Sequence, residues 1–435
     1  MFSKLKGLFI SLSIRNYRIF CMGQGISLIG TWIQRTTMGW FVYRLTGSAF
    51  LLGLVSFLSM IPSVFISPFA GAWADRWNRH HIMILTQVAF FIQTSVLAIL
   101  VLSGTINENV QYPILIMAIL QGIIEAIDAP IRQSFVIDLV QKRSMLPNAI
   151  ATNSAMFNGA RLIGPAVGGL LIILLSEGVC FALNAFSYIP VIISLLFIRI
   201  HYPPVVKSSE STFKKIMDGW KYSWSSYPIR FLVLNLAIYT LFGMSYTTLM
   251  PVFAKDILHG NSGTQGILMS TAGIGALTGS MFLASKKFIK GMALRLIITG
   301  LSFSLSLICF ALSGSMWLSM FLMLFIGFSG MMTMATTNTL IQSVVADDMR
   351  GRVIALYTMA FSSMAPFGSL VMGTLTSHFG ARYTLIICST IFLLWSLSSL
   401  RHSSQFLRGI LRMLVISNNK EMYRVKSLAP ELIVR

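Results

Sequence analysis

The residues best suited to chemistry in this sequence lie along one apolar run, between residues 111 and 137. They are spaced by four, three and four residues: Gln121, Glu125, Asp128 and Arg132. In a helix, such spacing places side chains on one face. An ionisable group inside a membrane costs about 2.5–3.5 kcal/mol on insertion scales, so it is a functional candidate by default. The stripe therefore predicts a polar site inside a membrane-spanning helix.

The two acids of this stripe, Glu125 and Asp128, are candidates for proton coupling. Burial disfavours the charged form of a carboxylate, whereas a nearby arginine favours it. A change in solvent access would then load or release a proton. The alternative is a static ion pair: Asp128 and Arg132 have i,i+4 spacing, and Arg161 in the following run is a competing partner for Glu125.

Three other apolar runs carry comparable polar or aromatic stripes. Their members are Gln24, Ser27, Thr31, Arg35 and Met38; Asn235, Tyr239, Phe242 and Tyr246; and Met331, Met334, Asn338 and Gln342. The first half of the chain contributes charged groups to these stripes, and the second half contributes aromatic, amide and methionine side chains. Such a mixture suits an amphiphilic solute, and methionine surfaces favour broad specificity.

The elements that position these stripes follow from the composition. Of 435 residues, 55% are hydrophobic and 11% are charged, whereas soluble domains carry about 25% charged residues. Runs of about 20 apolar residues are long enough to span a membrane as helices. The pattern predicts an all-α membrane protein with twelve spans, at residues 18–44, 49–74, 82–103, 111–137, 147–175, 179–200, 229–254, 264–284, 292–313, 316–345, 351–376 and 383–401.

The formal charge of +20 would indicate nucleic-acid binding in a soluble protein. Here the lysines and arginines gather in alternate loops between the spans, and the opposite loops keep Arg44, Lys255 and Arg382. Basic residues are enriched in cytoplasmic loops. This bias predicts that both termini are cytoplasmic, that membrane lipids are partners and that nucleic acid is not.

The spans fall into two sets of six, separated by one long polar connector. The predicted organisation is an N-terminal six-helix bundle (1–200), a cytoplasmic connector (201–228), a C-terminal six-helix bundle (229–401) and a basic cytoplasmic tail (402–435). The stretch FKKIMDGWKYSW in the connector is expected to form an interfacial helix. A faint echo between QGIIEAIDAPIRQSFVIDLV and IGFSGMMTMATTNTLIQSVV is consistent with an internal repeat.

A short charged loop, GAWADRWNRHH, separates the second and third spans. Its pattern closely resembles the loop motif G-x-x-x-D-R-x-x-R-[RK] of the major facilitator superfamily, with His80 departing from the last basic position. The resemblance implies two six-helix pseudo-repeats around a central cavity, lined by spans one, four, seven and ten. It makes the stripes substrate-cavity candidates: Gln24, Thr31, Arg35, Gln121, Arg132, Asn235, Tyr239, Tyr246, Asn338 and Gln342.

The loop is predicted to be a latch that holds the two halves together on the cytoplasmic side while the cavity faces out. Asp75 would face the positive N-terminal end of the eleventh span, and the loop arginines would pair with Asp138 and with Asp347 or Asp348. The alternative is that these basic residues are only topological anchors. The predicted latch residues are Gly71, Asp75, Arg76, Arg79 and Asp138.

A second motif in the fifth span, Gly164-Pro165-x-x-Gly168-Gly169, resembles an element of exporters of this superfamily that exchange substrate for protons. Ala160 stands where the longer form of the motif has glycine. Proline removes a backbone donor, and glycines let a neighbouring helix approach closely. The motif therefore predicts a tight seal between spans, although an ordinary packing face has the same features.

Residues 12–400 as a whole resemble the bacterial exporter branch that includes the enterobactin exporter, in stretches such as DAPIRQSFVIDLV and MRGRVIALYTMAFSSMAPFGSLVMGTL. The resemblance implies a secondary active transporter of the bacterial inner membrane: a proton-coupled antiporter that exports a small amphiphilic molecule, drug-like or siderophore-like, by alternating access. An importer or lipid flippase on the same fold, and a scaffold without transport, are the alternatives.

The sequence offers no support for an enzyme. It contains no GxxxxGK[ST] phosphate loop, no HExxH and no evident nucleophile–base pair. We therefore expect no catalytic residues, no metal and no cofactor. The expected partners are a small-molecule substrate, protons and membrane lipids.

Overall fold

The computed structural model describes residues 10–74, 78–107, 111–140, 143–199, 212–285 and 291–401, and every element in these segments is helical. The first long helices are α2 (Arg15–Thr46), α3 (Ala49–Ala74), α4 (Arg79–Leu102), α5 (Tyr112–Val140), α6 (Leu146–Leu174) and α7 (Glu177–Phe197), with short 3₁₀ turns η1 (Ile10–Ser13) and η2 (Arg143–Met145). After α8 (Thr212–Ser225) come α9 (Tyr227–Ile238), η3 (Tyr239–Gly243), η4 (Met244–Leu249), α10 (Met250–Val252), η5 (Phe253–Ile257), α11 (Ser262–Ala284), α12 (Met292–Leu312), α13 (Met316–Val344), α14 (Asp347–Phe379) and α15 (Ala381–Arg401).

Eleven helical segments in the described part of the chain are long and apolar enough to cross a membrane. The chain is therefore an integral membrane protein. The first predicted span, α2, is not among the eleven: it is 32 residues long but has the weakest apolar character of the long helices. It contains Arg15, Arg18, Arg35 and Arg44. The predicted total of twelve spans thus depends on α2.

Several helices begin earlier than the apolar runs indicate, because polar residues cap them. The side chain of Asn78 accepts hydrogen bonds from the backbone of His80 and His81, so α4 begins at Arg79. Ser176 caps α7, and Asn261 forms a reciprocal capping box at the start of α11. These side chains satisfy backbone donors that a helix start leaves unpaired.

The seventh predicted span is a broken helix. An α-helical segment, α9, is followed by the π-helical turn η3, the 3₁₀ turn η4, the short α10 and a second π-helical turn, η5. Pro251 lacks the backbone donor that a continuous helix would use. Such irregular turns inside membrane helices are common at functional sites. The prediction of one regular helix over 229–254 was wrong in this respect.

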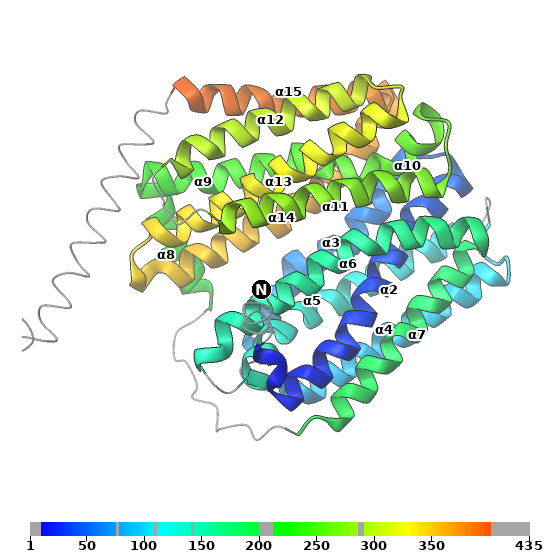
Figure 1. The fold of residues 1–435 in the computed structure, drawn as a ribbon, viewed down its shortest axis with the longest axis horizontal. Coiled ribbons are helices and arrows are strands. Elements are labelled where there is room, and N and C mark those ends of the chain that lie inside the picture. The colour runs from blue at the N-terminus through cyan, green and yellow to red at the C-terminus, as the bar shows by residue number, and fades with distance from the viewer. Residues whose placement is uncertain are drawn as a thin grey trace, which may run out of the picture.

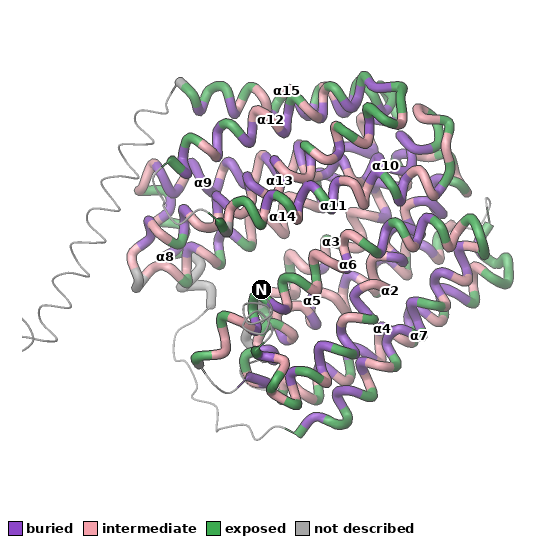
Figure 2. The backbone as a smooth tube through the Cα atoms, in the orientation of Figure 1, coloured by how far each residue is buried: buried purple, intermediate pink, exposed green. Residues whose placement is uncertain are grey.

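The long helices gather into two groups, α2–α7 and α9–α15 (Figure 1). Within the first group, α2 packs on α6 and α7, while α3 and α4 pack on α5. Within the second, α13 packs on α11 and α12, and α12 packs on α15. Buried and exposed segments alternate along most helices, as expected of helices packed on one face (Figure 2).

The two groups contact each other mainly through α3 with α14 and α6 with α11. A methyl group at Gly53 would lie 2.6 Å from the carbonyl oxygen of Ser369 and 2.9 Å from the Cα of Gly373. One at Gly169 would lie 2.5 Å from the carbonyl oxygen of Ser262. Glycines thus allow close backbone contact at the end of the bundle that carries the α2–α3 connection. Toward the opposite end, which carries α8, the two groups diverge (Figure 1).

Candidate transport site

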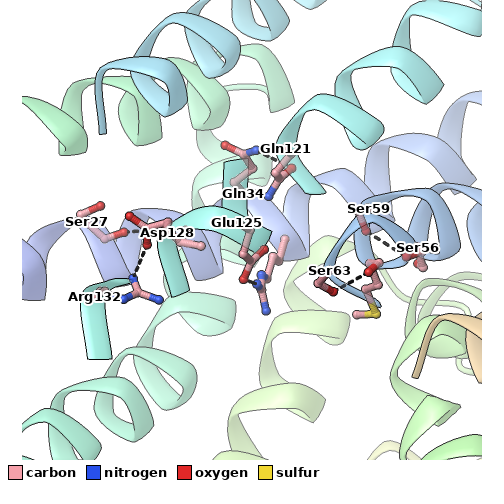
Figure 3. Close-up of polar contacts among 12 residues, drawn as sticks. Ser27, Gln34, Ser56, Ser59, Ser63, Gln121, Glu125, Asp128 and Arg132 are labelled. Carbon is pink, nitrogen blue, oxygen red and sulfur yellow. Dashed lines mark hydrogen bonds and ion pairs between the residues drawn. The ribbon is translucent and has the colours of Figure 1, made fainter. Parts of the chain in front are cut away.

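An ion pair joins two helices of the first group near the middle of their length. Arg35 of α2 donates from its guanidinium to the carboxylate of Glu125 of α5. Figure 3 labels Glu125 together with Asp128 and Arg132 of the same helix. Each of the two side chains is 36% exposed. The pair is therefore charge-neutral and only partly enclosed by the protein. The sequence placed both residues in polar stripes without identifying them as partners.

A buried network of amides holds these two helices in register. The side-chain nitrogen of Gln34 donates to the side-chain oxygen of Gln121 over 3.1 Å. The oxygen of Gln34 accepts from Asn184 of α7 and from Thr94 of α4, the latter over 3.3 Å. Gln34 directly precedes Arg35 in α2, so the network also holds in place the backbone from which Arg35 reaches Glu125. Sequence reasoning missed Gln34, Thr94 and Asn184, whose only signal was a polar type inside an apolar run.

Asp128 lies in a different environment from Glu125, one turn along the same helix. Its side chain is 1% exposed and accepts hydrogen bonds of 2.8 Å from both Thr86 and Gln87 of α4. Arg132 completes the set at 3.4 Å. The two acids of the predicted stripe thus have different neighbours, because α5 turns Asp128 into its contact with α4 while Glu125 faces α2.

The remaining first-group candidates are largely enclosed. Gln24 is 2% exposed. Thr31 donates its hydroxyl to the carbonyl oxygen of Ser27 one turn earlier, over 2.9 Å. The expected alternative pair between Arg161 and Glu125 is not the one that forms, because Arg35 occupies the carboxylate. Arg161 instead places its guanidinium 5.9 Å from the ring centre of Trp32.

In the second group, the broken seventh span contributes the aromatic part of the site. Tyr239 and Tyr246 line a pocket together with Met331 and Met334 of α13, and Arg161 of α6 lies at its border. Both tyrosines are buried, at 4% and 5% exposure. The predicted aromatic and methionine surface therefore exists, and a residue of the other group borders it.

Three predicted second-group residues lie apart from this pocket. Asn235 accepts a hydrogen bond from the indole of Trp395 over 3.1 Å, so it faces α15. The π-helical turn that begins at Tyr239 changes the helical register of Tyr246 relative to Asn235 and Tyr239. Gln342 donates to Asn338 over 3.0 Å on an exposed face of α13.

The charged loop after α3 is only partly within the described residues. Asp75 and Arg76 lie outside them, and so do the surroundings of Gly71 and the side chains of Asp347 and Asp348. The predicted pair between Arg79 and Asp138 forms, with the guanidinium 3.0 Å from both carboxylate oxygens. This pair joins α4 to α5 within the first group.

The glycines of the fifth-span motif all face neighbouring backbones. A methyl group at Gly164 would lie 2.3 Å from the Cβ of Trp32, and one at Gly168 would lie 3.3 Å from the Cα of Ile33. Gly169 faces α11 across the boundary between the groups. The motif therefore packs α6 closely on both α2 and α11, which is the geometry that a seal requires.

Known structures with this helical arrangement are membrane transporters. A bacterial homologue of the human lysosomal transporter Spinster, solved in an inward-facing and unoccupied conformation, matches with a TM-score of 0.71 and 14% identity, over 91% of this chain and 98% of that one. A POT family transporter in complex with 5-aminolevulinic acid matches with a TM-score of 0.72 and 13% identity, over 90% and 96% of the two chains. The chain shares the fold of these two transporters.

The chain belongs to the transmembrane secretion effector family of the major facilitator superfamily, whose model matches residues 7–407. The staphyloferrin A transporter of Staphylococcus aureus is 29% identical over 85% of this chain and 92% of its own length. Macrolide efflux protein A of Streptococcus pyogenes is 24% identical over 85% and 93% of the two chains. The protein is thus a transporter of small molecules and not an enzyme.

Proposed function

We propose that the protein is a proton-coupled exporter of a small amphiphilic molecule, siderophore-like or drug-like, in a bacterial plasma membrane. The observation that carries the proposal is the Arg35–Glu125 pair, an ionic site inside the membrane-spanning region that the protein only partly encloses. The relatives support export as the direction of transport, because a macrolide efflux protein is among them. The staphyloferrin A transporter aligns with 85% of this chain and supports a siderophore-like substrate.

The transport cycle we propose is alternating access between two six-helix repeats, with α2 as the first of twelve spans. The groups touch at the end that carries the α2–α3 connection and diverge toward α8. The distribution of basic residues favours a cytoplasmic location for α8 and both termini. The conformation described here would then receive substrate from the cytoplasm. In the opposite conformation, the loop after α3 would close the cytoplasmic side as a latch.

We assign the proton to Glu125. When this carboxylate is protonated it loses its charge, and its ion pair with Arg35 weakens to a neutral hydrogen bond. A proton entering from outside would thus release Arg35, and loss of the proton to the cytoplasm would restore the pair. Asp128 was the other candidate, but three surrounding donors and 1% exposure make it better suited to holding α4 against α5.

The direction of transport is testable in membrane vesicles from cells that produce the protein, with vesicles from cells carrying an empty vector as the control. Everted vesicles with an acidic lumen should accumulate staphyloferrin A or a macrolide, and a protonophore should abolish the accumulation. Accumulation in right-side-out vesicles alone would indicate an importer. Transfer of a lipid analogue without solute transport would indicate a flippase, and no transport of any of these would contradict the proposal.

A further inference from the structure

Arg161 of α6 carries a charge that no carboxylate balances within the described part of the chain. None of the ion pairs formed there includes it. The obvious partner, Glu125, is already paired with Arg35. A charged group inside a membrane-spanning segment is costly and usually faces a partner or a water-filled cavity. Arg161 is therefore a candidate for binding an anionic group of a ligand.

The position of Arg161 is fixed by an aromatic platform. Its guanidinium lies 5.9 Å from the ring centre of Trp32, and that of Arg35 lies 5.3 Å from the same ring. Trp32 is itself held by Gly164, where any side chain would collide with its Cβ. Phe157 packs edge-on against the same indole at 5.9 Å. The guanidinium is thus directed by packing, while its hydrogen-bond donors stay available.

The pocket beside Arg161 supplies two more donors. Tyr239 and Tyr246 line it and are held by Phe303, whose ring centre lies 5.1 Å and 6.3 Å from theirs. Among the described residues, no hydrogen bond uses either tyrosine hydroxyl, although both side chains are at most 5% exposed. Neither hydroxyl oxygen is among the fully buried unpartnered atoms of the described residues. Each hydroxyl can therefore donate a hydrogen bond to an acceptor of a ligand in the pocket.

We propose that Arg161, Tyr239 and Tyr246 form the binding site for a carboxylate group of the transported molecule. Arginine is a donor-only group whose planar fork matches a carboxylate, and one positive charge balances one negative charge. Met331 and Met334 line the same pocket and would contact the apolar part of the molecule once the pocket widens, because its volume in this conformation is about 20 Å³. The inference rests on the proposed function as a transporter and specifies its substrate class: an amphiphilic carboxylate.

The site also spans the boundary between the two helix groups. Arg161 belongs to the first group, whereas the other residues that line the pocket belong to the second. A ligand held by both would therefore favour those conformations in which the two surfaces are close. Binding of the carboxylate would in this way be coupled to the movement of one group against the other.

The test uses purified full-length protein in nanodiscs and two fluorescent probes of nearly the same shape, dansylglycine and its carboxamide. We expect the wild type to bind the carboxylate about tenfold more tightly than the amide. Arg161→Gln should remove this preference, and Arg161→Lys, which keeps the charge but not the fork, should retain part of it. Equal affinities for the two probes in the wild type, or no saturable binding of either, would contradict the assignment.

The matched control is Arg230→Gln. Arg230 lines a separate cavity with Tyr227 and Trp395, so the substitution removes an arginine beside aromatic rings without touching the proposed site. It should leave the preference intact, and a loss there instead of at Arg161 would overturn the assignment.

The single-atom substitution Tyr246→Phe keeps the packing and should lower the affinity for the carboxylate probe a few-fold. This variant tests the site even if the arginine variants do not fold. An unchanged affinity would remove this tyrosine from the site.

Because the assay measures binding alone, it stays informative if vesicle transport proves not to be proton-driven export. Such an outcome would refute the proposed function and leave the carboxylate site standing.

Discussion

Two ionic sites lie one turn apart on α5 and differ in their surroundings. Glu125 pairs with an arginine of another helix and is 36% exposed, whereas Asp128 pairs with Arg132 of its own helix and is 1% exposed. Two further donors from α4 surround Asp128. A fully satisfied, dry carboxylate can fasten helices together, while a half-open one can exchange partners and protons. Burial, rather than charge or spacing, thus separates the two roles.

The largest expected effect comes from removing the buried acid. Asp128→Leu would leave Arg132 and the α4 donors without their acceptor, and breaking a buried ion pair costs about 3–5 kcal/mol. Glu125→Leu should cost far less, because solvent and Arg35 can rearrange around a half-exposed site. Thermal unfolding in detergent measures both. Similar losses of stability for the two variants would contradict the conclusion that Asp128 holds α4 against α5 while Glu125 is free to exchange its proton and its partner.

A smaller loss of stability is expected from Gln87→Leu. This substitution removes one of the donors to Asp128, and a hydrogen bond to a charged group is worth about 1.5–3 kcal/mol. The matched control is Gln121→Leu, which breaks the neutral hydrogen bond to Gln34 and should cost about 0.5–1.5 kcal/mol. If Gln121→Leu lowered the stability more than Gln87→Leu, the hydrogen bonds around Gln34, and not those around Asp128, would contribute most to holding the helices together.

Accessibility can be compared directly with cysteines at the two acid positions, in a variant that lacks the four native cysteines. A polar thiol reagent should modify Glu125→Cys about tenfold faster than Asp128→Cys, since the latter needs local opening of α4 from α5. Adding Gly169→Val, which disturbs the contact between the groups, should alter the rate at position 125 alone. The control Gly159→Val has no atom within 4 Å of the added Cβ and should alter neither rate. Equal rates at the two positions would contradict the structure of the site.

The fold could largely be predicted from the sequence, because long apolar runs separated by charged loops leave few alternatives to membrane helices. Helix starts were less certain, since caps such as Asn78 and Asn261 extend helices beyond the apolar run. The break in the seventh span could not be foreseen, because a π-helical turn leaves the apolar pattern of its sequence unchanged. It nevertheless changes the register at which Tyr246 joins Tyr239 in lining the pocket.

The sequence predicted which residues carry the charges of the site, but not which of these residues pair with one another. The stripe on α5 identified Glu125 and Asp128, and the first span contributed Arg35. Which arginine pairs with which acid depends on the rotation of α5 against α2 and α4, and no spacing within one helix contains that information. The same limit explains why Arg161 was expected to neutralise Glu125 and instead lies beside the pocket of the second group.

The most direct test of the account is proton-driven accumulation in everted vesicles by Glu125→Gln, compared with Glu177→Gln. Glu177 also pairs with an arginine of α2, Arg44, but at the helix end. The account predicts that Glu125→Gln abolishes accumulation driven by a pH gradient while substrate exchange at equal pH persists, and that Glu177→Gln retains both activities. Full pH-driven accumulation by Glu125→Gln would contradict the assignment of the proton to this residue.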